Sequence, residues 1–287
     1  MKPASFIFHR ASSLDDALAL LAQHPEAKPL AGGQSLIPAM NFRLALPPAL
    51  VDLNRVTELA GITAHAGGLR VGAMTRHVTV ERSDLVRKFA PLLAETMPHV
   101  AHPQIRSRGT LGGSLAHADP SAELPAVMVA LDATFVLKSR TGERRVKATE
   151  FFTGLFETAL AKGELLTAVD IPPRAARSGS SFIEVARRHG DYALAGAATE
   201  LSLDGGGNFA SVRLALLSVG DGPVLARSPA SLIGQSPTPE AIRAVADAVM
   251  EEIDPPGDIH AESGYRKQLA GVLTRRTLTL AVQRASQ

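Results

Sequence analysis

Two glycine pairs, each beside a hydroxyl residue, constrain the fold of this chain most. The first lies in LAGGQSLI (residues 30–37), directly after a short apolar run, and the second in GTLGGSLAHADPSAELP (residues 109–125). Glycine allows positive φ and lets backbone N–H groups approach a ligand without obstruction by a Cβ atom. Successive N–H groups in such a bend form an anion-binding concavity. Each pair alone is explained by a plain turn, but two of similar make indicate two loops that face one polyanionic ligand.

Neither segment carries a standard nucleotide-binding motif. G-x-G-x-x-G is missing, which argues against a Rossmann fingerprint, and G-x-x-x-x-G-K-[ST] is missing, which argues against a P-loop. The residues by themselves therefore leave two interpretations open, a dinucleotide or phosphate site and a pair of structural turns.

Composition narrows the classes of function. The 287 residues include no cysteine, which excludes disulfides, thiol chemistry and a cysteine-ligated iron–sulfur cluster on this chain, and fits a reducing cytosol. Aromatic residues make up 4% and no dense Lys/Arg block occurs, so nucleic acid is not expected as a partner. We expect neither a membrane span nor a signal peptide, because no uncharged apolar run of about 18 residues occurs.

Hydrophobic periodicity predicts a mixed α and β chain with at least two domains. Helices are expected at residues 12–25, 83–97, 123–131, 237–253 and 263–285, and residues 35–48 are expected to be helical for two turns and to stop at Pro47-Pro48. Strands are expected at residues 28–30, 49–55, 133–139, 164–171, 181–187, 193–204 and 209–220, with a hairpin at 61–74 and a turn between two strands at 140–146. Pro172 to Ser181 is rich in Pro, Ser, Gly and Ala, and is the expected boundary.

Two of these helices have apolar positions at helical spacing. In the first, Leu85, Phe89 and Leu92 fall on one face. In the C-terminal helix, the expected apolar side consists of Leu269, Val272, Leu273 and Leu280. Packing against the core is the default interpretation of both faces, with a partner-subunit contact as the alternative for the C-terminal helix.

Three longer segments, in order, carry a family resemblance: residues 31–59, 102–131 and 187–198. The chain resembles the FAD-binding medium subunit of molybdenum hydroxylases, a family that includes carbon monoxide dehydrogenase, xanthine dehydrogenase and bacterial N-heterocycle hydroxylases. The resemblance covers nearly the whole chain and implies an α+β fold. It places a two-part FAD-binding domain of the vanillyl-alcohol-oxidase (PCMH) type at residues 1–175, with subdomains at about 1–57 and 58–175. A smaller α+β C-terminal domain follows at residues 178–287.

The resemblance also implies a non-covalent FAD site, with no catalytic side chain and no metal on this chain. Both glycine segments would clasp the pyrophosphate, Glu123 would hold a ribityl or adenosine hydroxyl where other members often have Asp, and Tyr192 would pack near the isoalloxazine. Glu184 stands where some members have Lys, so it receives no role. The full implied cofactor-binding set is Leu30, Ala31, Gly32, Gly33, Gln34, Ser35, Leu36, Ile37, His102, Thr110, Leu111, Gly112, Gly113, Ser114, Glu123, Leu165 and Tyr192.

The implied function is that of a cytoplasmic oxidoreductase subunit. Electrons would come from the [2Fe–2S] clusters of a small partner subunit in a complex whose large subunit holds molybdopterin, and would pass through FAD to an external acceptor. The complex would be a dimer of heterotrimers. The lack of cysteine agrees with iron–sulfur clusters that are held by a partner subunit and not by this chain. Two alternatives remain open at this point, a free-standing FAD-dependent oxidase or dehydrogenase of the same fold and a non-enzymatic phosphate-binding module.

Several polar residues near the second glycine segment invite other interpretations. His99, His102 and His117 could ligate a metal together with Asp119, but the irregular, proline-rich context favours hydrogen bonding in the flavin pocket by His102 and His117. Arg106 and Arg108 flank the segment, and either phosphate pairing or a solvated or subunit-contact position fits them equally well.

Overall fold

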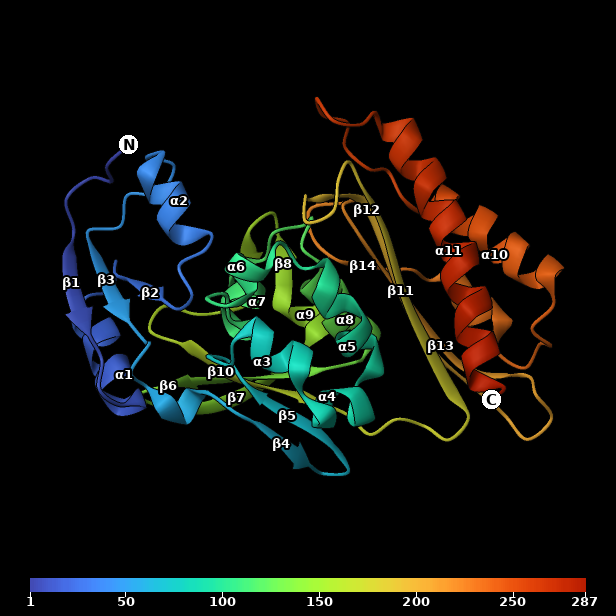
Figure 1. Ribbon diagram of the computed structural model, residues 1–287, viewed down its shortest axis with the longest axis horizontal. Coiled ribbons are helices and arrows are strands. Elements are labelled where there is room, and N and C mark those ends of the chain that lie inside the picture. The colour runs from blue at the N-terminus through green and yellow to red at the C-terminus, as the bar shows by residue number, and fades with distance from the viewer.

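The computed structural model describes residues 1–287 as three regions along the longest axis of the molecule (Figure 1). A small N-terminal region lies on the left of that view, a central region in the middle, and a sheet covered by two long helices on the right. No helix combines the length and the apolar character needed to cross a bilayer.

The N-terminal region is a parallel three-stranded sheet of order β1-β3-β2 with two helices. Its elements are β1 (Ile7–Arg10), α1 (Leu14–Gln23), β2 (Lys28–Leu30), α2 (Leu36–Asn41) and β3 (Ala49–Asp52). The Ser13 hydroxyl caps α1 by accepting a hydrogen bond from the Asp16 N–H, as the sequence predicts. Because β2 and β3 run parallel, the segments that follow them leave from the same edge of the sheet.

The central region is built on an antiparallel sheet of order β4-β5-β10-β6-β7. Its first half comprises η1 (Thr57–Leu59), β4 (Ile62–His65), β5 (Gly68–Gly72), α3 (His77–Arg82), α4 (Asp84–Phe89), α5 (Pro91–Thr96), η2 (Met97–His99) and α6 (Pro103–Arg106). Its second half comprises α7 (Leu111–His117), α8 (Glu123–Ala130), β6 (Thr134–Ser139), β7 (Gly142–Lys147), α9 (Ala148–Phe151), β8 (Phe152–Gly154), β9 (Glu157–Thr158) and β10 (Leu165–Ile171). The predicted hairpin is confirmed as β4 and β5, which turn at Ala66 and Gly67.

The C-terminal region is an antiparallel sheet of order β11-β12-β13-β14. Its elements are β11 (Ser178–Ala186), β12 (Ala193–Leu203), β13 (Phe209–Leu217), β14 (Val224–Leu225), η3 (Ser228–Leu232), α10 (Pro239–Glu252) and α11 (Ser263–Ala285). Helix α11 packs on β11 and β12, while α5 and α8 of the central region meet the sheet from the other side (Figure 1). Phe182 and Leu217 consequently belong to the same apolar core as the central helices.

Three sequence predictions about helices are wrong in detail. The single helix expected at residues 83–97 is broken into α4 and α5 at Pro91, because proline has no N–H to continue the hydrogen-bond ladder. Leu85 is therefore 37% exposed, and Val86 is buried in its place. Helix α2 has about the two turns expected but ends at Asn41, before Pro47-Pro48, since Arg43 adopts positive φ.

The buried face of α11 also differs from the expected one. Of the four apolar residues predicted to face the core, only Leu273 is fully buried, and small residues such as Ala270 and Gly271 take the inner face. The reason is a close approach of helix and sheet: a Cβ atom on Gly179 of β11 would lie 1.9 Å from the Ala281 carbonyl oxygen. Strand β11 also starts inside the stretch expected to be a linker.

Candidate functional site

The two glycine segments lie against each other although about 80 residues separate them in sequence. A Cβ atom on Gly32 would lie 2.5 Å from the Arg108 carbonyl oxygen and 2.8 Å from the Gly109 Cα. A Cβ atom on Gly113 would lie 3.4 Å from the Ala31 Cβ. Any side chain larger than hydrogen at Gly32 would separate the segments, so glycine is required there by packing.

The first segment presents a continuous row of unpaired backbone donors. None of the N–H groups of residues 31–36 donates a hydrogen bond within the chain, and these residues are half-buried apart from Ser35, which is exposed. The carbonyls on the opposite side are engaged: the Asn54 Nδ2 donates to the Ala31 oxygen at 3.1 Å, and the Gln34 Nε2 donates to the Gly32 oxygen at 3.0 Å. Gly33 has φ +72°, the left-handed region that favours glycine.

The backbone N–H groups of the second segment already donate hydrogen bonds within the chain. The N–H groups of Leu111 and Gly112 donate to the carbonyls of Thr75 and Ala73 at 3.0 and 2.8 Å, and that of Gly113 donates to the Thr110 hydroxyl at 3.1 Å. The expectation that this segment presents its amides in the same way as the first is therefore wrong. Its glycines serve close packing instead, because a Cβ atom on Gly112 would lie 2.4 Å from the Ala73 Cβ.

Two hydroxyl groups and two apolar side chains complete the neighbourhood of the free amides. Neither Ser35 nor Ser114 has its hydroxyl engaged in a hydrogen bond within the chain, so both can meet a ligand. Leu30 and Ile37 flank Gly33, where a Cβ atom would lie 3.3 Å from Leu30 Cδ1 and 3.1 Å from Ile37 Cγ1. Leu36, the remaining apolar residue of this set, is half-buried at the start of α2. The side-chain amide of Gln34 donates one of its two N–H groups to the Gly32 carbonyl.

A second group of site residues lies where α8 meets the β11–β12 turn. Glu123 opens α8 and is 7% exposed. His99 Nδ1 lies 3.4 Å from Glu184 Oε1, and the other oxygen of Glu184 is buried without a partner. Tyr192, at the end of the turn, is 63% exposed. Glu184 received no role from the sequence, whereas its side chain is buried near Glu123 and His99 in the structure.

The electrostatics of this cluster favour the protonated form of Glu123. Burial, together with the charge of Glu184, raises the pKa of Glu123 to about 7. The hydrogen bond to Glu184 raises the pKa of His99. Partial desolvation and the charges of Asp119 and Glu123 raise the pKa of the Tyr192 phenol. Glu123 is thus able to carry a proton near neutral pH, which an exposed glutamate would not do.

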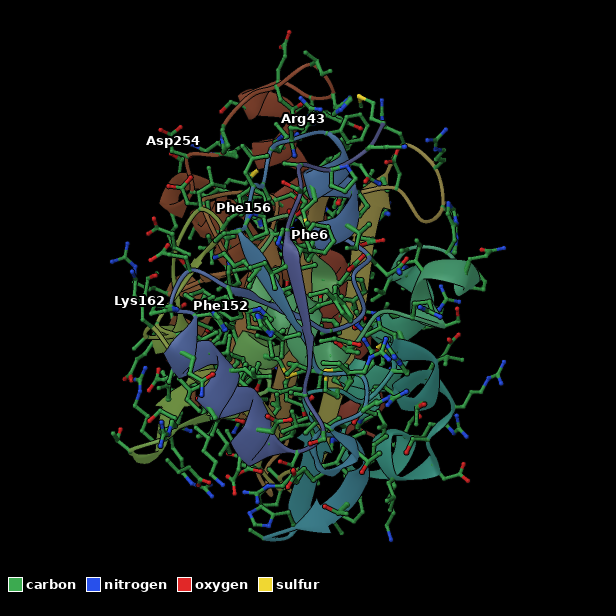
Figure 2. All side chains as sticks on the ribbon, turned by 90° about the vertical axis from the view of Figure 1, so that its left-hand side faces the viewer. Phe6, Arg43, Phe152, Phe156, Lys162 and Asp254 are labelled. Atoms are coloured by element: carbon green, nitrogen blue, oxygen red, sulfur yellow. The ribbon has the colours of Figure 1, made fainter.

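The two histidines expected in the flavin pocket contact different partners. The ring of His102 lies against the β11–β12 turn, since a Cβ atom on Gly190 would be 2.4 Å from its Cε1. The ring of His117 is tilted against that of Phe156, with ring centroids 5.1 Å apart. Phe156 is labelled in Figure 2. Desolvation lowers the pKa of His117.

The remaining residues near the second segment have structural positions. Arg106 is buried and donates to both oxygens of Glu81, at 2.9 and 3.3 Å, and to the carbonyls of residues 98, 100 and 101. Arg106 is therefore committed within the protein, whereas Arg108 is exposed. Leu165 lies in the apolar core with Met74 and Leu18, and Ala31 of the first segment packs against the same core.

Sequence reasoning missed Asn54 and Arg76. Asn54 follows β3, and it reaches the glycine segment that follows the neighbouring parallel strand β2. Carboxyl ends of adjacent parallel strands meet at one sheet edge, so the pairing of β2 and β3 is the signal that could have identified Asn54. Arg76 lies far along the chain and has no such local signal.

Two family models match most of the chain. The family described as the FAD binding domain in molybdopterin dehydrogenase matches residues 4–174, and the family described as the CO dehydrogenase flavoprotein C-terminal domain matches residues 180–281. The chain belongs to the FAD-binding medium-subunit family of molybdenum hydroxylases. The fold class expected from the sequence, an FAD-binding domain followed by a C-terminal α+β domain, is confirmed.

Relatives of this medium-subunit family match over almost their entire length. The 6-hydroxypseudooxynicotine dehydrogenase complex subunit alpha of Paenarthrobacter nicotinovorans is 41% identical over 99% of this chain and 97% of its own. The carbon monoxide dehydrogenase medium chain of Hydrogenophaga pseudoflava is 36% identical over 100% of both. A solved quinoline 2-oxidoreductase of Pseudomonas putida 86 matches with a TM-score of 0.95 at 41% identity, covering 100% of both chains. Two of these relatives are named as subunits or chains, which favours a subunit of a complex over the free-standing alternative.

The residues of the site fit the flavin cofactor of the family. A dinucleotide carries two linked phosphates, and the row of unpaired N–H groups at residues 31–36 is a donor set that matches an anion. When bound, FAD supplies reversible electron acceptance, and the protein supplies binding, orientation and electrostatics.

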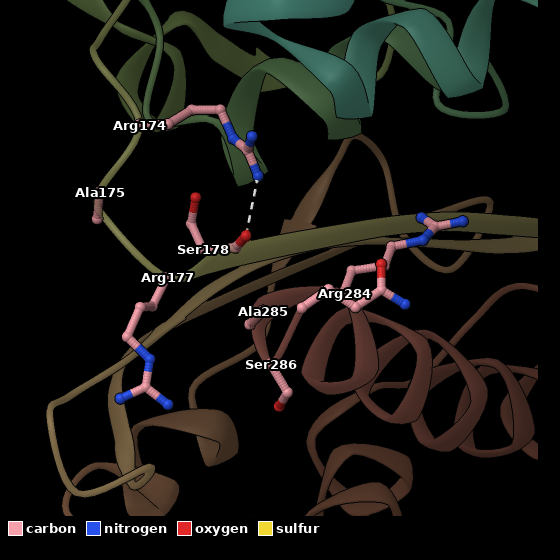
Figure 3. Close-up of a pocket in the computed structure, with 8 residues that line it drawn as sticks. Arg174, Ala175, Arg177, Ser178, Arg284, Ala285 and Ser286 are labelled. Carbon is pink, nitrogen blue, oxygen red and sulfur yellow. Dashed lines mark hydrogen bonds between the residues drawn. The ribbon is translucent and has the colours of Figure 1, made fainter.

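A separate cavity of ≈ 420 Å³ lies between the interdomain segment and the C-terminus (Figure 3). Its arginines are committed within the chain: Arg174 donates to the Ser178 carbonyl at 3.1 Å, Arg177 to the Asp204 carbonyl, and Arg284 to Glu95 at 2.6 Å. These bonds use only some of the five N–H donors of each guanidinium, so the cavity offers side-chain donors, whereas the first glycine segment offers backbone N–H groups.

Proposed function

We propose that the diphosphate of non-covalently bound FAD lies on the N–H groups of residues 31–36. The single observation that carries this proposal is the unbroken row of donors without partners in a segment that is not fully buried. Backbone N–H groups that the chain leaves unpaired are satisfied by water or by a ligand, and a row of them in one bend is a donor set that suits a diphosphate.

Other residues of the expected set receive more specific roles. The hydroxyls of Ser35 and Ser114 donate to phosphate oxygens from opposite segments. Glu123, which holds a proton near neutral pH, bonds a hydroxyl of the ribityl chain or the adenosine. Tyr192 packs near the isoalloxazine, and His102 orders the turn that carries Tyr192 by filling the space beside Gly190.

We further propose that this chain works in a complex with a small iron–sulfur subunit and a large molybdopterin subunit, assembled in the cytoplasm as a dimer of heterotrimers. Electrons reach the flavin from [2Fe–2S] clusters of the small subunit and leave for an external acceptor. Two observations support this division: the chain has no cysteine to ligate a cluster, and its relatives are named as subunits or medium chains of dehydrogenases. This proposal is tested by identifying the subunits and the metals that co-purify with this chain.

The domain division proposed here runs at residues 175–178, with the FAD-binding part divided again near residue 57. The four sheets support it, because each lies within one of the three proposed parts. The apolar core, however, continues from the central helices onto β11, β12 and β13, so the two domains share part of their core.

The substitution Gly33→Ala tests the diphosphate site. It strains a position with φ +72° and reorients the free amides, so we expect the FAD content of the purified chain to fall by about tenfold or more. Gly234→Ala is the matched control, because Gly234 has φ +79° and open space around it in the C-terminal region. The control carries the same backbone strain and should retain flavin. Equal flavin content in all three proteins would refute the assignment of the amides.

A further inference from the structure

We propose that Asn54 is a positioning residue that aims the N–H groups of Gly32 and Gly33 at the diphosphate, and that Arg76 holds Asn54 in place. The inference rests on the proposed FAD site and adds to it two residues that would not themselves touch the cofactor. The steps that lead to it are the geometry of two peptide groups, the anchoring of Asn54, and the link from Arg76 to the second glycine segment.

The first step is the geometry of the peptide bonds. In a trans peptide the C=O and the following N–H point in opposite directions. The Ala31 carbonyl is held by Asn54 Nδ2 at 3.1 Å, and the Gly32 carbonyl is held by Gln34 Nε2 at 3.0 Å. The N–H groups of Gly32 and Gly33 therefore point away from these side chains, and both lack a partner in the chain.

The second step is that Asn54 is itself fixed. Its backbone N–H donates to Asp52 Oδ1 at 3.0 Å, and its side-chain amide also donates to Asp52 Oδ1, at 2.5 Å. The side-chain oxygen Oδ1 of Asn54 accepts a hydrogen bond from Arg76 Nη2 at 2.6 Å. Because Arg76 takes the oxygen, the amide group of Asn54 has only one orientation that satisfies its neighbours, with the nitrogen toward Ala31.

The third step is that Arg76 ties both glycine segments together. Its Nη1 donates to the Arg108 carbonyl, the same carbonyl that Gly32 approaches most closely. The backbone of Arg76 forms an isolated bridge with Thr110, which caps the second segment. A single guanidinium thus sets the distance between the two segments and the orientation of Asn54.

The charge of Arg76 fits an anionic ligand nearby. Burial and the neighbouring charge of Arg108 lower the pKa of Arg76, while the charge of Asp52, which also pairs with Arg10 at 3.5 Å, acts in the opposite direction. A diphosphate placed on the amides would relieve the repulsion between Arg76 and Arg108. The positioning role therefore predicts an effect on diphosphate recognition in particular, while a merely structural role predicts a loss of all ligand binding.

The experiment compares ADP with adenosine, which differ only in the diphosphate, and includes FAD as the proposed cofactor. Binding of FAD, ADP and adenosine to the flavin-free full chain is measured by calorimetry for wild type, Asn54→Ala, Asn54→Asp and Arg76→Met. We expect Asn54→Ala to weaken FAD and ADP by about tenfold, the loss for one misplaced hydrogen-bond set, and adenosine by less than about twofold. Asn54→Asp should weaken FAD and ADP further, because its carboxylate cannot donate to Ala31 and repels phosphate. Asn208→Ala, in the C-terminal region, is the matched control and should bind as wild type does.

Two results would overturn the positioning role. One is an unchanged ADP affinity in Asn54→Ala, and the other is an equal loss for ADP and adenosine. If Asn54→Ala fails to fold, the same comparison of ADP with adenosine is made on Arg76→Met. That substitution removes the hydrogen bond that orients the Asn54 amide but keeps the amide itself. Failure of the proposed function looks different: the wild-type chain itself would then bind neither FAD nor ADP.

Discussion

Glu123 is the residue through which the stability of this protein should depend on pH. Its carboxyl is 7% exposed at the start of α8, next to Glu184 and His99, and its pKa is raised from 4.5 to about 7. A group whose pKa is raised on folding stabilises the protein while it is protonated in both states. That contribution is complete below the unfolded pKa of 4.5 and is lost as pH rises through 7.

The size of the effect follows from the difference between the two values. The difference of 7 − 4.5 = 2.5 pKa units corresponds to about 3 kcal/mol at about 1.36 kcal/mol per unit. Glu123→Gln replaces the carboxyl by a neutral group of the same shape, so it imitates the protonated form. We expect the variant to be within about 1 kcal/mol of wild type at pH 5, and more stable than wild type by about 3 kcal/mol at pH 8.

Urea unfolding of the flavin-free chain at several values between pH 5 and pH 8 measures this difference. Glu240→Gln is the control, because Glu240 also lies in the first turn of a helix but is exposed. The hydrogen bond from His99 to Glu184 raises the pKa of His99 and adds a pH dependence of the same sign in wild type and variant. Parallel stability curves for wild type and Glu123→Gln across this range would refute the reasoning.

Two further substitutions test the packing around the second glycine segment. Gly112→Ala should destabilise the chain by about 1–3 kcal/mol, because its Cβ would lie 2.4 Å from the Ala73 Cβ, while Gly205→Ala, with open space around it, should leave the thermal midpoint unchanged. Arg106→Met should cost about 3–5 kcal/mol by thermal unfolding, since it leaves Glu81 without its buried partner; a change below about 1 kcal/mol would contradict that role.

Local sequence signals predicted the elements that depend on local rules. Helix α1 follows from its serine cap and its leucine spacing, and strands β11 to β13 follow from long β-type runs. The break at Pro91 was also a local signal, and it was outweighed by the apolar spacing on either side of it. The buried face of α11 was not predictable in this way, because it is set by the close approach of Gly179 on another element.

The residues that orient the site depend on tertiary structure. Asn54 and Arg76 act on the first glycine segment from 23 and 45 residues away in sequence (54 − 31 and 76 − 31), and no spacing rule connects them to it. The place of Glu184 is similar: its position in β11 is predictable, but its burial beside His99 is decided by how the domains share their core. Sequence thus identified the donors of the site more readily than the residues that hold those donors.

The two glycine pairs show why a shared motif does not imply a shared role. Both combine Gly-Gly with a hydroxyl residue, yet only the first leaves its N–H groups unpaired. The difference comes from the neighbours: carbonyls of Ala73 and Thr75 accept from the second segment, whereas side chains of Asn54 and Gln34 occupy the carbonyls of the first and leave its donors free. Whether a glycine bend binds an anion is therefore determined by which side of each peptide the rest of the fold engages. Substituting a carbonyl-binding side chain should alter anion affinity as surely as substituting the glycine itself.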